Sequence, residues 1–249
     1  MQEIDSISFY KKCDARVLGC LEYKTKTLIV NKVYKHHDFG EIGTDEFDKL
    51  KSLFNTNLNN AAQDFNAYIL HFRDSLFGYK ELAIKRLLPK NKKLSSLNPN
   101  ERNKLLKEAK TRADSRISSH FEHVKSSNKK CKRSLEKFNS IDFYVFNEDI
   151  NYIEKYGENK IWIKKDSLLG KLFFSKHPQA SYLIIKPDGN YFVSNRYISK
   201  TNYLQLIKKS DWSKFQKDLE LSISKNSRFG EGFFAKKDLI AKNECIIEY

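Results

Sequence analysis

The spacing of apolar and polar residues changes along the chain, and the first pattern predicts strands. Residues 16–23 and 27–34 are rich in β-branched and aromatic side chains, and the polar residues 24–26 separate them. Such runs favour extended structure, and the short polar spacing between them is typical of a hairpin. We therefore expect residues 1–43 to form a small β-rich N-terminal segment.

After residue 43 the apolar residues recur every three or four positions, which predicts two long helices. In the first run these positions are Phe47, Leu50, Phe54, Leu58, Ala61, Phe65, Tyr68, Phe72 and Leu76. The second run begins after residues 98–100 and continues to Phe138. Residues at this spacing share one face of an α-helix. Because the loop between the runs is basic and contains Pro89, residues 44–140 are expected to form a basic antiparallel helical hairpin.

The pattern becomes mixed again beyond residue 140. The predicted strands are residues 141–146, 161–163, 181–185 and 191–193. The last two flank Asp188-Gly189, a dipeptide typical of tight hairpin turns. Residues 200–221 have helical spacing, so residues 141–221 are expected to be a mixed α/β segment. The whole chain is therefore predicted to have an α+β fold.

Composition narrows the class of protein. Apolar residues make up 40% of the chain and aromatic residues 13%, which is enough to build a folded core. The sequence has no stretch of about 18 consecutive apolar residues, so we expect no membrane span. Residues 1–5 contain two acidic residues, and the N-terminus lacks the apolar core of a secretory signal, which indicates a cytoplasmic or nuclear protein.

The cysteines and histidines give no metal motif. Cysteines stand at positions 13, 20, 131 and 245 without a CxxC pair, so we expect reduced, buried thiols. His120 and His123 would share a helix face, but no thiol or carboxylate set accompanies them at ligand spacing. We therefore expect no metal site.

Positive charge is concentrated in one part of the sequence. The chain has a net charge of +15, and residues 80–137 hold 18 Lys and Arg against 6 Asp and Glu, a net +12. The candidate binding residues in this stretch are Lys104, Lys107, Arg112, Arg116, Lys129, Lys130, Lys132 and Arg133. They fit a solvated helix face, a surface for nucleic-acid phosphates, or a surface for an acidic protein, and no base-reading motif accompanies them.

A glycine-rich segment, Gly230-Glu231-Gly232-Phe233-Phe234-Ala235, lies close to the C-terminus. It formally fits the GxGxxA pattern of dinucleotide sites, which need an apolar strand before the glycines and a helix after them. Here the preceding residues 224–228 are polar, and residues 236–249 have a strand-turn-strand pattern. A nucleotide-dependent enzyme is therefore kept only as a third hypothesis.

Residues 222–249 closely resemble the opening of a SET domain, the fold of a large class of protein-lysine methyltransferases. The residues that follow the family's order are Gly230, Gly232, Phe234, Ala235, Asp238, Glu244, Ile246, Ile247, Glu248 and Tyr249. Two features depart from the family. The stretch between Asp238 and Glu244 is one residue longer, and Asn243 replaces the usual turn glycine. Asparagine also tolerates the left-handed conformation that such a turn needs.

The resemblance implies an S-adenosyl-L-methionine-dependent protein-lysine N-methyltransferase that acts on a protein with a target lysine. It implies that Glu231, Gly232 and Phe233 line the cofactor, because a glycine lets the main chain approach closely. The family's Asn-His pair, which completes the cofactor pocket, and its catalytic tyrosine segment do not occur in these 249 residues. We therefore name no catalytic residue and expect residues 222–249 to begin an incomplete SET domain that is inactive alone.

A hypothesis from another class stands beside the enzyme. Residues 80–137 would form a basic helical binding module for nucleic acid or an acidic protein partner, without enzymatic activity.

Overall fold

The computed structural model of the chain describes residues 6–24, 29–58, 64–73, 79–89, 93–146, 161–164, 167–177, 180–196 and 200–235. The strands are β1 (Leu18–Lys24), β2 (Ile29–Lys35), β3 (His37–Glu41), β4 (Ala67–Arg73), β5 (Ser140–Phe146), β6 (Ile161–Lys164), β7 (Tyr182–Ile185) and β8 (Asn190–Ser194). The α-helices are α1 (Ser6–Cys13), α2 (Thr44–Thr56), α3 (Tyr79–Leu87), α4 (Pro99–Lys137), α6 (Ser167–Leu169), α7 (Lys200–Lys208) and α8 (Ser213–Ser224). Shorter helical segments are η1 (Leu94–Ser96), η3 (Gly170–Phe174) and η4 (Gly232–Phe234). The predicted α+β class is confirmed.

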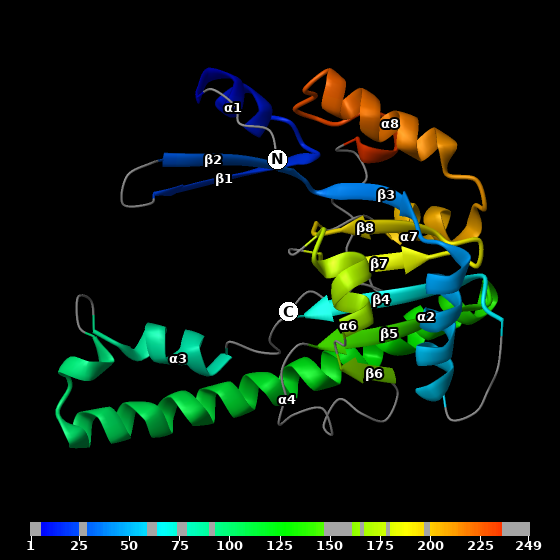
Figure 1. Cartoon of the computed structure of the whole chain (residues 1–249). Coiled ribbons are helices and arrows are strands. Elements are labelled where there is room, and N and C mark those ends of the chain that lie inside the picture. Colours follow the sequence, from blue (N-terminus) through cyan, green and yellow to red (C-terminus); the bar gives the residue numbers. More distant parts are fainter. Residues whose placement is uncertain are drawn as a thin grey trace.

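Six strands form one mixed sheet in the order β3-β8-β7-β4-β5-β6 (Figure 1). Strands β3, β8, β7 and β4 pair antiparallel, whereas β4, β5 and β6 pair parallel. Strands from segments 1–43, 44–140 and 141–221 therefore lie side by side in one sheet.

Both faces of the central strands are buried. Along β4, Ile69 belongs to one core cluster and the neighbouring Leu70 to the other. The first cluster also contains residues of α7, α8 and η4, and the second contains residues of α2, α6 and η3. Because side chains alternate across a strand, the sheet is the middle layer between two sets of helices.

The predicted N-terminal hairpin is confirmed, since β1 and β2 pair antiparallel with Leu18 opposite Lys35 and Lys24 opposite Ile29. The segment also contains a helix, α1, which the sequence did not predict. The turn after α1 brings Cys13 back to β1, where it forms a disulfide with Cys20 across a Cα–Cα distance of 5.6 Å. The expectation of reduced thiols is therefore wrong for this pair.

The first predicted long helix is wrong beyond Thr56, where α2 ends. Residues 67–73 form β4 in the middle of the sheet. Tyr68 and Phe72 fit a helical spacing, but Ile69 and Leu70 between them are also fully buried. A strand covered on both faces is a continuous apolar run, and periodicity alone does not distinguish that run from a helix.

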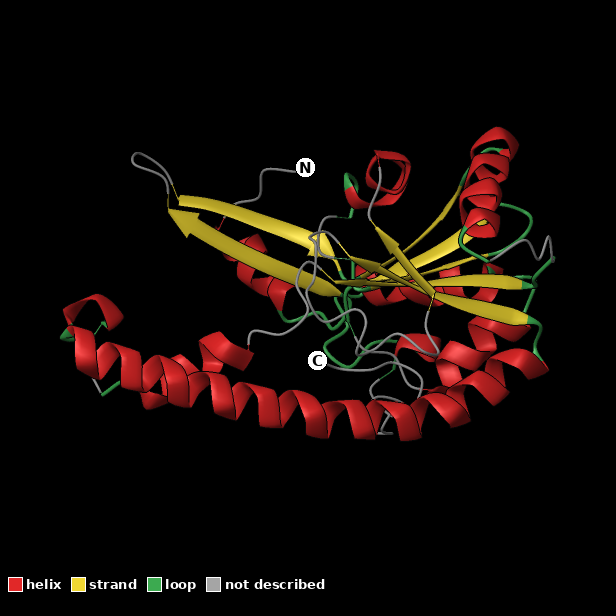
Figure 2. Cartoon of the chain, turned by 90° about the horizontal axis from the view of Figure 1, so that it is seen from below, coloured by secondary structure: helices red, strands yellow, loops and turns green. Residues whose placement is uncertain are grey.

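The second predicted helix is confirmed as α4, and a capping box defines its start. Asn98 Oδ1 accepts from the Glu101 N–H at 2.9 Å, and Glu101 Oε2 accepts from the Asn98 N–H at 3.3 Å. Helix α3 packs against α4. Figures 1 and 2 show this helical hairpin and the β1–β2 hairpin extending beyond the six-stranded sheet on the same side.

The predicted helix over residues 200–221 is divided into α7 and α8. Asp211 lies in the break, and its Oδ1 accepts from the Ser213 N–H at 2.8 Å and from the Ser213 hydroxyl at 2.5 Å. These hydrogen bonds lower the pKa of Asp211. A short acidic side chain that bonds the next turn's backbone favours a new helix start over continuation.

The predicted β7–β8 hairpin is confirmed, and Gly189 supplies the positive φ of 86° that its turn needs.

Lys186, directly after β7, is 5% exposed. Its Nζ donates to the Ile207 carbonyl at the end of α7 and lies 5.8 Å from the centre of the Trp212 ring. Burial lowers the pKa of this lysine to about 8, with Asp188 opposing the shift.

We expect the stability difference between the wild type and Lys186→Met to depend on pH. Between pH 8 and 10.5 the unfolded wild type binds the Lys186 proton more often than the folded protein does. Wild-type stability should therefore rise with pH in this window by up to about 1.4 kcal/mol per unit, relative to the variant. Urea unfolding of both proteins from pH 7.5 to 10.5 measures this difference. Subtracting one stability curve from the other cancels the contributions of the lysines and tyrosines that the two proteins share. If the free energies of unfolding of the two proteins changed equally with pH, the lowered pKa of buried Lys186 would be contradicted.

Candidate functional site

The predicted basic residues lie on one long helix. Lys104, Lys107, Arg112 and Arg116 are exposed on the half of α4 that extends beyond the sheet, and Arg133 is exposed near its end. Lys129, Lys130 and Lys132 also belong to α4, but their side chains lie outside the described residues. The structure thus places five of these cationic side chains in solvent.

Small buried residues of α4 hold the helical hairpin together. Ala109 is completely buried and Ala113 is 4% exposed, while Ala83 on α3 is 8% exposed. Small side chains let two helices approach closely, which leaves the long cationic side chains on the outer surface. One of them is paired, since Arg112 Nη2 lies 2.7 Å from Glu108 Oε1. Both partners are about half exposed, so this ion pair adds little stability.

The residues expected to line a cofactor, Glu231, Gly232 and Phe233, lie in and before η4. Their backbone groups are largely engaged within the protein. The Glu231 N–H donates to Ser222 Oγ at 2.8 Å, and the Phe233 N–H donates to Asp218 Oδ2 at 3.0 Å. The Phe233 carbonyl accepts from Asn202 Nδ2 at 2.7 Å. A cofactor that uses these groups must displace contacts with α7 and α8.

Both glycines of the motif are required by the local backbone. Gly230 and Gly232 have φ values of 71° and 50°, in the left-handed region. A Cβ on Gly232 would collide with the Asp218 carboxylate, and a Cβ on Gly230 with the Phe234 carbonyl. The packing of η4 on α8 therefore accounts for glycine at position 232, and the tight turn into η4 accounts for glycine at position 230. The rest of the SET-like segment, residues 236–249, lies outside the described residues.

Two adjacent buried histidines lie where β2 passes into β3. His36 Nδ1 lies 2.7 Å from Asn195 Oδ1, and His37 Nδ1 lies 2.8 Å from Ser194 Oγ. Burial lowers the pKa of His36 to about 4 and that of His37 to about 3, with nearby Arg196 adding to both shifts. Both rings are therefore neutral at pH 7.

The Ser194–His37 pair has the residue types of a nucleophile and its base, but not the accessibility. Ser194 is 1% exposed. Its hydroxyl also donates to the Arg196 carbonyl at 2.8 Å and accepts from the Arg196 N–H at 3.1 Å. A hydroxyl with these partners is a structural hydrogen-bonding centre at the end of β8.

The sequence did not reveal a pocket of about 200 Å³ beside these histidines. Its lining residues are Leu21, Lys32, Tyr34, Lys35, His36, Asp38, Lys176, His177, Ala180, Val193, Ser194 and Asn195. The pairing of β3 with β8 brings His36 and Asn195 together across 159 residues. The only signal in the sequence was the His36-His37 dipeptide, which does not identify its distant partners.

Among the described residues, no group of three or more His, Cys, Asp or Glu is arranged to hold a metal ion. In the same residues, no helix is both long and apolar enough to cross a bilayer. No protein-family model, curated protein or solved structure matches the chain significantly.

We expect Gly232→Ser to destabilise the protein by about 2–3 kcal/mol, because serine is strained at φ 50° and its Cβ collides with Asp218. Gly43→Ser is the matched control. Gly43 has φ −64° at the N-cap of α2, a position that serine favours, so its change should stay within about 0.5 kcal/mol. Urea unfolding of both variants tests this, and equal effects would show that η4 is not packed as described.

Proposed function

We propose that the chain contributes the N-terminal part of a SET-type, S-adenosyl-L-methionine-dependent protein-lysine methyltransferase. The single observation that carries this proposal is the ordered set of ten motif residues between Gly230 and Tyr249. The geometry adds a physical connection. The first half of the motif is packed on α8, with Phe233 and Phe234 buried in the core cluster of that face. The described part of the motif, which ends at Ala235, thereby belongs to the folded core.

In this proposal the methyl group passes from the sulfonium of the cofactor to a neutral lysine amine of a protein substrate. Orientation and desolvation of the amine would supply most of the rate enhancement. The described residues would connect the catalytic fold to a recruiting surface, and the motif glycines would keep the Cβ-free backbone that a close cofactor approach needs.

The natural gene product containing these residues should transfer a radiolabelled methyl group from S-adenosyl-L-methionine to lysine in protein. Residues 1–249 alone should show no heat of cofactor binding in calorimetry, because the motifs that complete the pocket are not among them. Acid hydrolysis of the labelled protein should yield methyl-lysine. A gene product that neither binds the cofactor nor transfers the label would end the proposal.

A second candidate function, nucleic-acid binding, is favoured by the exposed cations of α4. This helix has 39 residues, which corresponds to about 58 Å at 1.5 Å per residue. Lys104, Lys107 and Arg116 have no carboxylate partner among the described residues. Exposed cations along a long helix can contact the phosphates of a duplex, and such contacts read no bases.

The triple variant Lys104→Glu, Lys107→Glu, Arg116→Glu should weaken binding to duplex DNA. Each lost phosphate contact reduces the slope of log affinity against log salt by about 1, so the slope should fall by about 3. The matched control is Lys214→Glu, Lys217→Glu, Lys225→Glu on and just after α8, which changes the net charge equally. Equal losses in both triples, or a wild-type slope near zero, would rule out recognition through α4.

A further inference from the structure

The pocket beside His36 lies where the chain leaves the two-stranded sheet and enters the six-stranded one. Lys32 and Tyr34 are two residues apart on β2, so they point to the same side of the hairpin. Leu21 lies directly opposite Lys32 on β1 and lines the pocket with it. The hairpin therefore forms one wall of the pocket.

Hydrogen bonds and burial hold other lining residues in place. His36 and Asn195 are joined twice, through their side chains at 2.7 Å and from the Asn195 N–H to the His36 carbonyl at 3.0 Å. Val193 and Ala180 are buried and line the floor. A wall whose side chains are already fixed loses little entropy when a ligand binds.

The third wall is the end of η3 and the turn that follows it. The N–H groups of Lys176 and His177 both donate to the Phe173 carbonyl, at 3.2 Å and 2.8 Å. Phe173 is fully buried in the core. These bonds hold the backbone of Lys176 and His177 beside the pocket, so the two side chains start from a fixed position.

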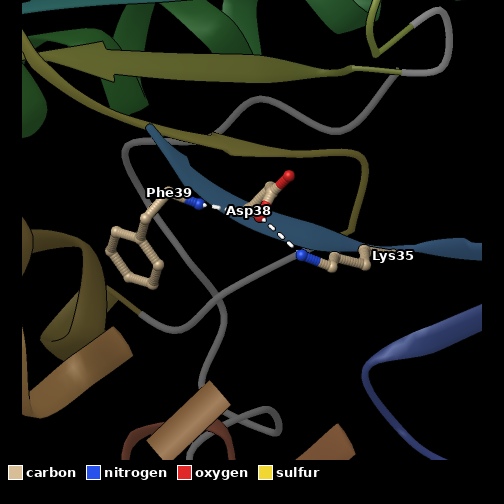
Figure 3. A network of polar contacts seen from close by, with 3 residues as sticks. All are labelled: Lys35, Asp38 and Phe39. Carbon is tan, nitrogen blue, oxygen red and sulfur yellow. Dashed lines mark hydrogen bonds and ion pairs between the residues drawn. The ribbon is translucent and has the colours of Figure 1, made fainter. Parts of the chain in front are cut away.

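The charges around the pocket are unbalanced. Three lysines line it, at positions 32, 35 and 176, against a single carboxylate, Asp38. That carboxylate is already used, because Asp38 Oδ1 accepts from Lys35 Nζ at 3.1 Å and from the Phe39 N–H at 3.2 Å (Figure 3). Lys32 and Lys176 have no carboxylate partner among the described residues.

We propose that this pocket binds a small organic phosphomonoester, with Lys32 and Lys176 contacting the phosphate. Lysine binds phosphate as a point charge, and two lysines from different walls can approach it together. The half-buried ring of His177 offers a hydrogen-bonding group, and burial lowers its pKa, which keeps the ring neutral. The apolar surface of Leu21, Ala180 and Val193 suits the organic part of the ligand, which must be small for a volume of about 200 Å³.

This site is separate from the functions proposed above. It uses neither the cations of α4 nor the glycines of the motif. Its residues lie on β1, β2, β3 and β8, directly after β2 and β8, and at positions 176, 177 and 180. Its test is therefore independent of the methyl-transfer and DNA-binding experiments.

Calorimetry on the 249-residue chain with ribose 5-phosphate, ribose and inorganic phosphate tests the proposal. Ribose 5-phosphate should bind, ribose should not, and inorganic phosphate should bind more weakly than the ester because it lacks the apolar contact. Lys32→Gln combined with Lys176→Gln should weaken ribose 5-phosphate at least about tenfold, since each lost charge-assisted contact costs that much. Lys214→Gln combined with Lys217→Gln, on the exposed side of α8, should leave affinity unchanged.

A second variant tests the volume without changing a charge. Ala180→Leu places three additional carbon atoms in the pocket and should also weaken ribose 5-phosphate at least about tenfold. Thermal unfolding of each variant confirms that it is folded before binding is compared. The proposal is overturned by absence of binding at about 10 mM ester, by equal affinity for ribose and its phosphate, by an ester no tighter than inorganic phosphate, or by pocket variants that bind like the wild type.

Discussion

Strands β4, β7 and β8 are buried on both faces, and the positions of the helices follow from that double burial. Ile184 and Phe192 face one layer, while their neighbours Leu183 and Val193 face the other. An apolar surface left on either side would remain in contact with water, at a cost of about 25 cal/mol per Å². Helices α2 and α6 therefore cover one face of the sheet and α7 and α8 cover the other, so that both apolar faces are removed from water.

The position of α4 also depends on the sheet, because its C-terminal end packs in the core while its other half extends beyond the strands. Its C-terminal end is fixed, because Leu135 is buried in a core cluster. Asn139 then turns the chain into β5 with a φ of 49°, and its side chain donates to the Asp64 carbonyl at 2.9 Å just before β4. The parallel strands β4 and β5 thus begin together, while the opposite half of α4 has no sheet to cover. Among the described residues α3 packs against this half, and Lys104, Lys107, Arg112 and Arg116 are exposed on it.

The parts of the fold that could be predicted from the sequence are those set by local signals. Asn98 and Glu101 mark the start of α4, and Asp188-Gly189 marks the β7–β8 turn. The strand β4 could not be recognised, because a strand covered on both faces loses the alternation that identifies strands. The break between α7 and α8 depends on Asp211, whose capping bonds compete with a helical pattern that continues through it.

The candidate sites show a similar division. The cations of α4 could be found by counting charges, because they are close together in the sequence. The pocket could not, since Lys32, Lys176 and Asn195 become neighbours only through the pairing of β3 with β8 and the turn after η3. The interpretation of Gly230 and Gly232 also changed in kind. Both have positive φ values, Gly232 lies against Asp218 of α8, and Gly230 lies against the Phe234 carbonyl, so the two glycines have a packing role that the motif alone did not suggest.

Lysine occurs in three different environments in this protein, and the environment is more informative than the number of lysines. On α4 the described lysines, such as Lys104 and Lys107, are in water, where a cation costs little and attracts any polyanion within a Debye length. The Lys186 amine is buried against Trp212 and the end of α7. Burial lowers its pKa, and its role there is structural, because Nζ donates to the Ile207 carbonyl. Around the pocket the lysines are only partly covered, and the one nearby carboxylate is already paired. Desolvation strengthens an electrostatic interaction only where a ligand can still reach the charge. A ligand can reach the pocket lysines and would cover them on binding, and a net charge of +15 does not reveal this arrangement.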